Sequence, residues 1–342
     1  ARTILTGESL PGVEGLSWVN HGPYRLKGLD DPVDICEVGE AGKAKLQPPE
    51  DTETGRRATA AGTETVLGWR PALGQVVRGT EWELQSRLGA GGFGEVWLAR
   101  HPRTKEQRVF KFCFRADHLR SLKREMTLFR LLKEALGERP DIARLFNVQF
   151  ERAPYYLELE YTPGGNLADW IESRGGFEAV SKVLRVNIGA QIADALAAAH
   201  SAGIIHKDIK PSNVLVEERK DGSMQIRLTD FGIGQLADRE TVERAGITLT
   251  GFTETAGGSS EVYSRSGTRL YMAPEMLEGK APTAVADIYA LGVLLYQLAC
   301  GDFSRALATG WERDIDDDLL REDIAACVDH LPENRIQSAG EL

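Results

Sequence analysis

The sequence has few cysteines, and they are not spaced in pairs. Its 342 residues include four cysteines (Cys36, Cys113, Cys300 and Cys327) and six equally scattered histidines. No CxxC pair and no Cys–His spacing typical of a zinc site is present. We therefore expect no metal site built from thiolates or imidazoles, and a reduced, cytoplasmic setting for the chain.

A long apolar run and an excess of basic residues are also lacking. The longest apolar run, residues 290–299, has about half the length that a membrane-spanning helix needs. The net charge of −10 gives the surface no general attraction for nucleic acid or anionic lipid. We therefore expect no nucleic-acid partner and no membrane anchor within this segment. The chain starts at Ala1 without a methionine or a signal-peptide pattern and stops at GEL, so we expect it to be a piece of a larger protein.

What is present is the composition of a globular protein, with 42% hydrophobic and 27% charged residues. Residues 1–39 contain short alternating runs that predict two strands joined by a turn. Residues 40–72 are poor in large apolar side chains and rich in Pro, Gly and Thr, which predicts a flexible linker. The expected domains are therefore 1–39, a linker at 40–81, and a main domain at 82–342.

The main domain begins with strand-like segments and continues with helical ones. Alternating apolar residues predict strands at 82–88, 95–100, 108–114, 142–150 and 155–161. Apolar residues at helical spacing predict a helix at 116–135, and the second half is helical at 181–203 and 286–300. A strand-rich part followed by a helix-rich part indicates an α+β fold.

Three glycines, Gly89, Gly91 and Gly94, form a GxGxxG pattern in GAGGFGEVW. The pattern alone is weak, and a plain hairpin turn is an equal alternative. A strand follows it here, whereas a dinucleotide-binding fold would continue into a helix. Such a hairpin can present backbone amides to phosphate groups without obstruction by side chains.

Lys111 lies inside an otherwise apolar strand, VFKF. A buried lysine is costly unless it is paired, and Glu125 on the following helix is the candidate partner. The alternative is that Lys111 occupies a solvated edge of the sheet.

Asp208 and Asn213 lie five positions apart in HKDIKPSN, on a predicted loop, and Asp230 follows in DFG after another apolar run. Two carboxylates and an amide at strand ends suit magnesium, which prefers oxygen ligands. Lys210 adds a positive charge beside them.

The motifs GAGGFGEV, VFK, HKDIKPSN, DFG, GTRLYMAPE and DIYALG occur in the order found in protein kinases. The chain from Trp82 onward resembles the eukaryotic-like serine/threonine kinases of bacteria. The resemblance implies a two-lobed fold, with a β-rich N-lobe at 82–160 and a mainly helical C-lobe at 161–342, truncated at its last helix. It also implies transfer of the γ-phosphate of ATP, with Mg²⁺ or Mn²⁺, to Ser/Thr hydroxyls of protein substrates and of its own activation loop.

The same resemblance assigns roles to individual residues. The nucleotide would be bound at Gly89, Gly91, Gly94, Val96, Lys111, Glu160 and Tyr161, with Leu159 at the back of the pocket. The catalytic set would be Asp208 as base, Lys210 at the γ-phosphate, and Lys111 fixed by Glu125. The metal would be held by Asn213 and Asp230. Thr268 would help to shape the site for a serine or threonine hydroxyl.

Other matching positions are expected to be structural. His206 and Phe231 resemble packed core residues, Asp287 the buried aspartate that holds the catalytic loop, and Glu275 with Arg335 a buried ion pair.

Lys207 departs from the family, where an arginine commonly clamps a phosphorylated activation loop. A lysine keeps the charge but lacks the bidentate fork, so this difference concerns regulation rather than chemistry. The candidate phosphorylation sites of the loop are Thr248, Thr250, Thr253, Thr255, Ser259, Ser260, Ser264 and Ser266.

The first 39 residues resemble the last strands of a class III nucleotide cyclase domain, without that family's metal-binding aspartates. A hairpin with no cyclase parent is the alternative. For the main domain, the alternatives to an active kinase are a pseudokinase scaffold that binds ATP without turnover and a small-molecule kinase. The GTxxY and APE sequences favour a protein substrate.

Overall fold

The computed structural model describes residues 16–26, 33–40, 55–57, 69–91, 94–114, 116–231, 235–236 and 267–342. The chain divides into two compact units, Ala1–Thr65 and Val66–Leu342. Within the described ranges, no helix combines the length and the apolar character needed to cross a membrane.

The first unit contains a three-stranded antiparallel sheet in the order β2-β1-β3. The two strands predicted here are present as β1 (Leu16–Leu26) and β2 (Val33–Glu40). The third strand, β3 (Gly55–Arg57), lies inside the segment predicted as a linker. Its backbone pairs with the end of β1, and GRR has no apolar pattern from which a strand could be predicted. These three residues thus form a strand within the segment for which a flexible linker is predicted.

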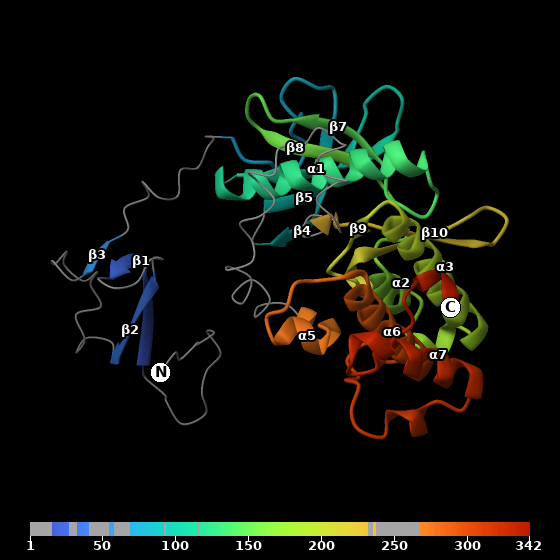
Figure 1. Ribbon diagram of the computed structural model, residues 1–342. Coiled ribbons are helices and arrows are strands. Elements are labelled where there is room, and N and C mark those ends of the chain that lie inside the picture. Colours follow the sequence, from blue (N-terminus) through green and yellow to red (C-terminus); the bar gives the residue numbers. More distant parts are fainter. Residues whose placement is uncertain are drawn as a thin grey trace. The chain divides into compact units, whose positions relative to one another are not determined.

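The second unit begins with a five-stranded antiparallel sheet in the order β4-β5-β6-β8-β7. Its strands are β4 (Glu83–Gly91), β5 (Gly94–Arg100), β6 (Gln107–Cys113), β7 (Leu145–Gln149) and β8 (Tyr155–Glu160), close to the predicted positions. One face packs against α1 (Ala116–Leu136) through Leu157 and Leu159. Figure 1 shows this helix lying across the sheet. The alternation along β6 and β8 turns Phe110, Phe112 and Tyr156 to the opposite face.

That opposite face is covered by residues 69–82, which precede β4. Trp69 and Val77 are buried there with the aromatic side chains of the sheet. Packing thus starts before residue 82, and the part of the predicted linker from Trp69 onward belongs to the folded unit.

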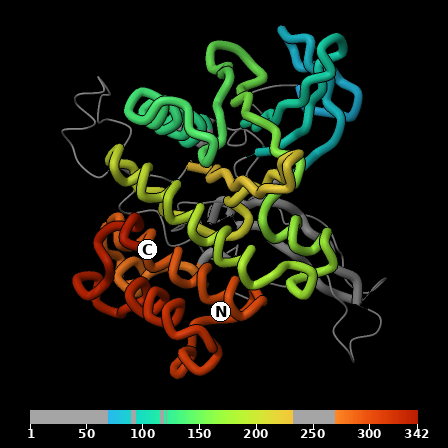
Figure 2. The backbone as a smooth tube through the Cα atoms, turned by 90° about the vertical axis from the view of Figure 1, so that its right-hand side faces the viewer, coloured from blue at the N-terminus to red at the C-terminus, as the bar shows by residue number. Residues whose placement is uncertain are grey.

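The helical lobe is built around α3 (Lys182–Ser201) and α6 (Ala284–Cys300), with α2 (Leu167–Ser173), α5 (Pro274–Leu277) and α7 (Asp318–Val328). The apolar run of residues 284–300 is a buried helix as predicted, and Gly301 ends it in the left-handed conformation. Two short sheets accompany the helices: β10 (Val214–Glu218) with β11 (Met224–Leu228), and β9 (Ile204–Ile205) with β12 (Gln235–Leu236). Figure 2 shows the strand-rich lobe above the helices, which confirms the predicted two-lobed α+β fold.

Candidate active site

The loop after β9 brings three of the predicted site residues into direct contact. Asn213 donates from Nδ2 to the backbone oxygen of Asp208 at 2.7 Å and to its carboxylate Oδ2 at 2.9 Å. The ammonium of Lys210 lies 2.8 Å from the same Oδ2. The other oxygen of Asp208, Oδ1, is buried and has no hydrogen-bond partner among the described residues. The loop therefore fixes one oxygen of this carboxylate, while the second has no hydrogen bond among the described residues.

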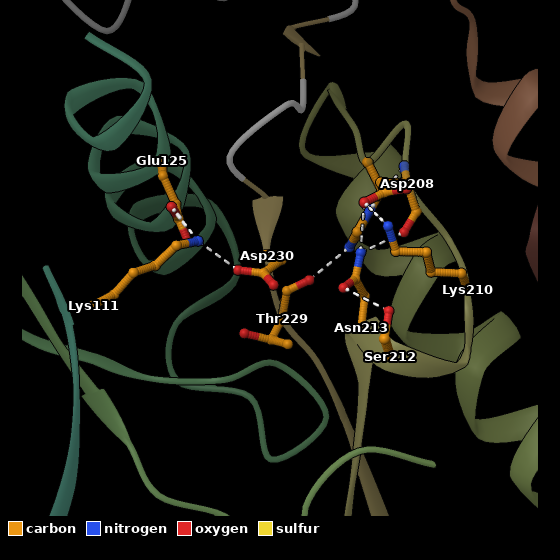
Figure 3. Close-up of polar contacts among 9 residues, drawn as sticks. Lys111, Glu125, Asp208, Lys210, Ser212, Asn213, Thr229 and Asp230 are labelled. Atoms are coloured by element: carbon orange, nitrogen blue, oxygen red, sulfur yellow. Dashed lines mark hydrogen bonds and ion pairs between the residues drawn. The ribbon is translucent and has the colours of Figure 1, made fainter. Parts of the chain in front are cut away.

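Lys111 forms the expected ion pair with Glu125, at 2.9 Å, and a second one with Asp230, at 2.6 Å (Figure 3). Burial alone would lower the pKa of Lys111, but the charges of Asp230 and Glu125 outweigh it and hold the pKa above its ordinary value. Burial raises the pKa of Glu125 although Lys111 opposes this. Burial would also raise the pKa of Asp230, but Lys111 outweighs it and lowers that pKa. One cation is thus shared by two carboxylates.

The segment before Asp230 connects these two groups. Thr229 donates its N–H to the carbonyl of Asn213 at 3.1 Å. The Thr229 carbonyl accepts a hydrogen bond from Nε2 of His206 at 2.9 Å, while Nδ1 of His206 lies 3.3 Å from the Asp208 amide nitrogen, which donates to it. His206 therefore links the backbone at Asp208 to the short segment between β11 and Asp230, a connection that the sequence did not predict.

Phe231 holds the position of α1 relative to the catalytic loop. Its ring lies 4.6 Å from the His206 ring and 5.7 Å from the ring of Phe129 on α1. Both His206 and Phe231 are fully buried, as expected for packed core residues. The helix that carries Glu125 and the loop that carries Asp208 are thus joined through two ring contacts of Phe231.

The glycine-rich hairpin is formed by the ends of β4 and β5, where Gly91 pairs with Gly94. Gly94 has φ +144°, and a Cβ there would lie 1.9 Å from the carbonyl oxygen of Phe112, so only glycine fits. A Cβ at Gly89, in contrast, would have no heavy atom within 4 Å. The two glycines differ accordingly: Gly94 allows close packing onto β6, and Gly89 keeps the hairpin surface open.

The remaining predicted nucleotide positions lie on β5 and β8. Val96 is the direct partner of Lys111 in the β5–β6 ladder. Leu159 is buried, and Glu160 ends β8 just before Tyr161. The N–H of Glu160 is donated to the Arg144 carbonyl at 2.9 Å, so this donor is already used within the protein.

The predicted metal ligands offer oxygen atoms. The Asp230 side chain is 44% exposed, and its Oδ1 accepts from Lys111. The amide nitrogen of Asn213 faces Asp208, and its Oδ1 accepts a long bond, 3.5 Å, from Ser212. Among the residues that the structure describes, no cluster of three or more His, Cys, Asp or Glu side chains is arranged to hold a metal ion. This donor set fits a magnesium ion that takes its other ligands from phosphates and water.

Asp287 holds the backbone of the loop that carries Asp208, as expected. Its carboxylate accepts from the backbone amides of His206 and Lys207, each at 2.7 Å. Nε2 of His200, on α3, donates to the same carboxylate at 2.9 Å, a contact without a signal in the sequence because 87 positions separate the two residues. Lys207 itself has φ +70°, and burial together with the nearby charge of Arg124 lowers its pKa to about 8.

The second expected ion pair is present in the helical lobe. Arg335 contacts Glu275 through two parallel bonds of 2.8 Å each. The predicted phosphorylation sites at residues 248–266 and the side chain of Thr268 lie outside what the structure describes.

Comparison with known proteins agrees with this geometry. A family model, the protein kinase domain, matches residues 82–317. The serine/threonine-protein kinase PkaA of Streptomyces coelicolor is 32% identical over 234 residues, which cover 65% of this chain and 39% of that protein. The serine/threonine-protein kinase Pkn1 of Myxococcus xanthus is 31% identical over 254 residues, covering 73% and 33%. The chain thus spans little more than a third of the length of these relatives.

Proposed function

The chain belongs to the protein kinase family, and we propose that it is an active protein serine/threonine kinase in which Asp208 is the catalytic base. One observation carries this proposal: Oδ1 of Asp208 is a buried acceptor without a partner among the described residues, while Oδ2 is fixed by Lys210 and Asn213. A buried acceptor without a donor is costly, so such an atom is suited to receive a substrate hydroxyl.

The other residues would act on the phosphates of ATP. Lys111, fixed by Glu125, would contact the α- and β-phosphates, and Lys210 would approach the γ-phosphate from beside Asp208. Gly89 would leave room for phosphates beneath the hairpin. Adenine would contact the backbone at Glu160 and Tyr161 and the side chain of Val96.

Asp230 and Asn213 would hold magnesium, with manganese as a substitute. The bound ion would neutralise charge on the β- and γ-phosphates. Asp230 also accepts from Lys111, so the same carboxylate would serve both the lysine and the metal.

The test is incubation of the chain with labelled ATP and magnesium, with a generic basic protein as substrate, followed by mapping of phosphorylated serines and threonines. Asp208→Asn keeps the size of the side chain and should reduce transfer by about 100- to 10,000-fold while ATP still binds. Binding without any transfer by the wild type would favour the pseudokinase alternative. ATP turnover without protein phosphorylation would favour a small-molecule kinase.

We further propose that the first unit is the end of a class III cyclase-like domain, with the kinase domain following it. The antiparallel pairing of β1 with β2 supports this, because the resemblance lies in the closing strands of that family. If the assignment is right, a protein extended upstream of residue 1 should contain the rest of a cyclase domain. An assay of that protein for conversion of ATP or GTP to a cyclic nucleotide tests the assignment.

A further inference from the structure

Trp69 is buried on the outer face of the β-rich lobe, outside the range that matches the kinase family model. Its side chain is only 4% exposed, and its ring lies 5.2 Å from the ring of Phe112. The family match begins at residue 82, so no kinase motif accounts for this contact. Trp69 thus packs on β6, the strand that carries Lys111, and its role in the lobe has to be explained by its contacts there.

The segment that carries Trp69, residues 69–82, is here named the strap. It is fixed to β4 by backbone hydrogen bonds: Gly74 donates to the Leu84 carbonyl at 2.8 Å, and Leu84 donates to the Gln75 carbonyl at 2.9 Å. A third bond, from Val77 to the Trp82 carbonyl at 2.9 Å, closes its turn. The strap is therefore an ordered extension of the sheet rather than a loose connection.

The contacts of the strap lead to the proposed phosphate-binding groups. Phe112 directly follows Lys111 on β6, and the Phe112 carbonyl is the atom against which Gly94 of the glycine-rich hairpin packs. Next to Trp69, the guanidinium of Arg70 lies 4.2 Å from the ring of Phe114. Phe114 stands between β6 and α1, the helix that carries Glu125.

We propose that Trp69, together with Arg70, is a positioning residue for the ATP site. Trp69 acts through Phe112 and Arg70 acts through Phe114. Phe112 and Phe114 in turn fix the positions of β6, the glycine-rich hairpin and the start of α1 relative to one another. Close-packed aromatic rings transmit small displacements, because an interior without voids has little room to adjust. The proposal rests on the proposed kinase function, since ATP is the ligand that the positioned groups would bind.

The alternative is that Trp69 only adds stability to the lobe. Trp82, at the other end of the strap, provides the matched comparison. Its ring lies 6.1 Å from the ring of Phe110 and 5.2 Å from that of His101, and among the described residues no ring pair joins Trp82 to Phe112 or Phe114. Truncation of either tryptophan removes a large side chain from the same face. Trp82 contacts Phe110, which precedes Lys111, whereas Trp69 contacts Phe112, which follows Lys111 and whose carbonyl packs against Gly94 of the hairpin.

The experiment compares Trp69→Ala, Trp82→Ala and Trp69→Phe in the whole chain, at a temperature where thermal melting shows all three folded. We expect Trp69→Ala to lower kcat/KM for ATP by about 10- to 100-fold, through a raised KM as well as a lowered kcat. Trp69→Phe keeps an aromatic ring on Phe112 and should stay within about threefold of the wild type. Trp82→Ala should lower the melting temperature without a comparable effect on KM.

Hydrogen exchange of the backbone supplies a readout that needs no activity. Trp69→Ala should speed exchange in residues 111–114 and in the first turns of α1, whereas Trp82→Ala should act on residues 108–110. Arg70→Ala is a surface change that leaves the indole of Trp69 in place, and it should speed exchange at Phe114 and in the first turns of α1. This variant can still be measured if Trp69→Ala does not fold. Equal kinetic losses in both tryptophan variants, or unchanged ATP kinetics in Trp69→Ala, would overturn the proposal. A wild type that neither binds nor turns over ATP would instead contradict the kinase function, with the exchange data still reporting on the strap.

Discussion

Two buried ion pairs of this chain have nearly equal separations and very different surroundings. The pair Lys111–Glu125 is 2.9 Å long and the pair Arg335–Glu275 is 2.8 Å long. Arg335 is fully buried, contacts Glu275 with two parallel bonds, and donates further bonds to the backbone carbonyls of Asp329 and Val285. Lys111 is partly exposed and is shared between Glu125 and Asp230.

The difference lies in the balance of charge and in the number of satisfied donors. Arg335 and Glu275 neutralise each other, and the hydrogen bond from Arg335 outweighs burial and lowers the pKa of Glu275. Around Lys111, two carboxylates face one cation, and burial raises the pKa of Glu125. A closed and balanced pair maintains a fold, whereas a pair with surplus negative charge is suited to accept further cations, such as metal ions that accompany phosphates.

The largest effect should come from breaking the unbalanced pair. Lys111→Met should reduce phosphate transfer by about 100- to 1,000-fold, because a preorganised charge at the phosphates is lost. The fold should persist, since Glu125 already has a raised pKa and can take up a proton when its partner is gone. Transfer of labelled phosphate and thermal melting measure the two outcomes.

Lys182→Met is the matched control for this variant, because Lys182 is 77% exposed and its nearest acid, Asp316, lies 4.0 Å away. It should leave both activity and melting unchanged. The opposite result would be a Lys111→Met protein that is largely unfolded while its folded fraction keeps full activity. Lys111–Glu125 would then maintain the fold and would not serve phosphate transfer.

Breaking the balanced pair should instead affect stability. Arg335→Met would leave the Glu275 carboxylate buried without a cation, and we expect a loss of about 3–5 kcal/mol in the free energy of unfolding. The double variant Arg335→Met/Glu275→Leu should recover much of this, because no charge is then left unpaired. Arg130→Met, at an exposed pair on α1, should give no measurable change. Urea unfolding of the four proteins decides the matter, and a double variant less stable than Arg335→Met would contradict the account.

The sequence predicts the helices and strands whose apolar residues recur at the spacing of that element, and the site residues that lie in short motifs. The strands β5, β6 and β8 alternate visibly, and α1 has apolar residues at helical spacing. Asp208 and Asn213 lie five positions apart on one predicted loop, and their hydrogen bond is of this local kind.

Other contacts were beyond prediction for physical reasons. The ion pair of Lys111 with Asp230 joins residues 119 positions apart, and no local pattern reports such a contact. The strap has an irregular backbone without periodicity, so the burial of Trp69 has no sequence signal. Such features depend on how the whole unit packs rather than on its segments.

The two ion pairs should also lose their carboxylate charge at different pH values. Glu125, with a raised pKa, takes up a proton in the folded protein before it does in the unfolded chain, so this step does not favour unfolding. Glu275, with a lowered pKa, keeps its stabilising charge above its ordinary pKa of 4.5 and loses it only as pH falls through the lower folded value.

Activity should therefore decline at a higher pH than stability. Once pH falls below the raised pKa of Glu125, the ionised form that holds Lys111 decreases by about tenfold per pH unit. Initial rates with saturating ATP and melting temperatures, measured across the same series of buffers from neutral pH downward, give the two midpoints. Coincident midpoints would show that loss of activity is merely unfolding.

The smallest effect is expected at Lys207, which lies near the carboxylate of Asp287 and the guanidinium of Arg124. Its backbone is held by the structural carboxylate Asp287, while its side chain lies near the charge of Arg124 on α1. A phosphorylated activation loop would meet a single ammonium here, a point contact without the two parallel bonds of a guanidinium. Ordering a loop costs roughly 1–2 kcal/mol per fixed residue, which one such contact does not offset.

Phosphatase treatment should therefore lower the activity of the wild type by less than about tenfold, or about 1.4 kcal/mol. Burial and Arg124 lower the pKa of Lys207 to about 8, and a phosphate dianion beside it would raise that pKa again. The contact should therefore be weaker at pH 9, where it must first protonate the amine, than at pH 7. Lys207→Arg stays charged and should make activity more dependent on loop phosphorylation at both pH values, and Lys207→Ala less. The measurement compares treated and untreated enzyme for the three versions at each pH. A wild type that dephosphorylation switches off completely would mean that this lysine clamps phosphate as firmly as an arginine.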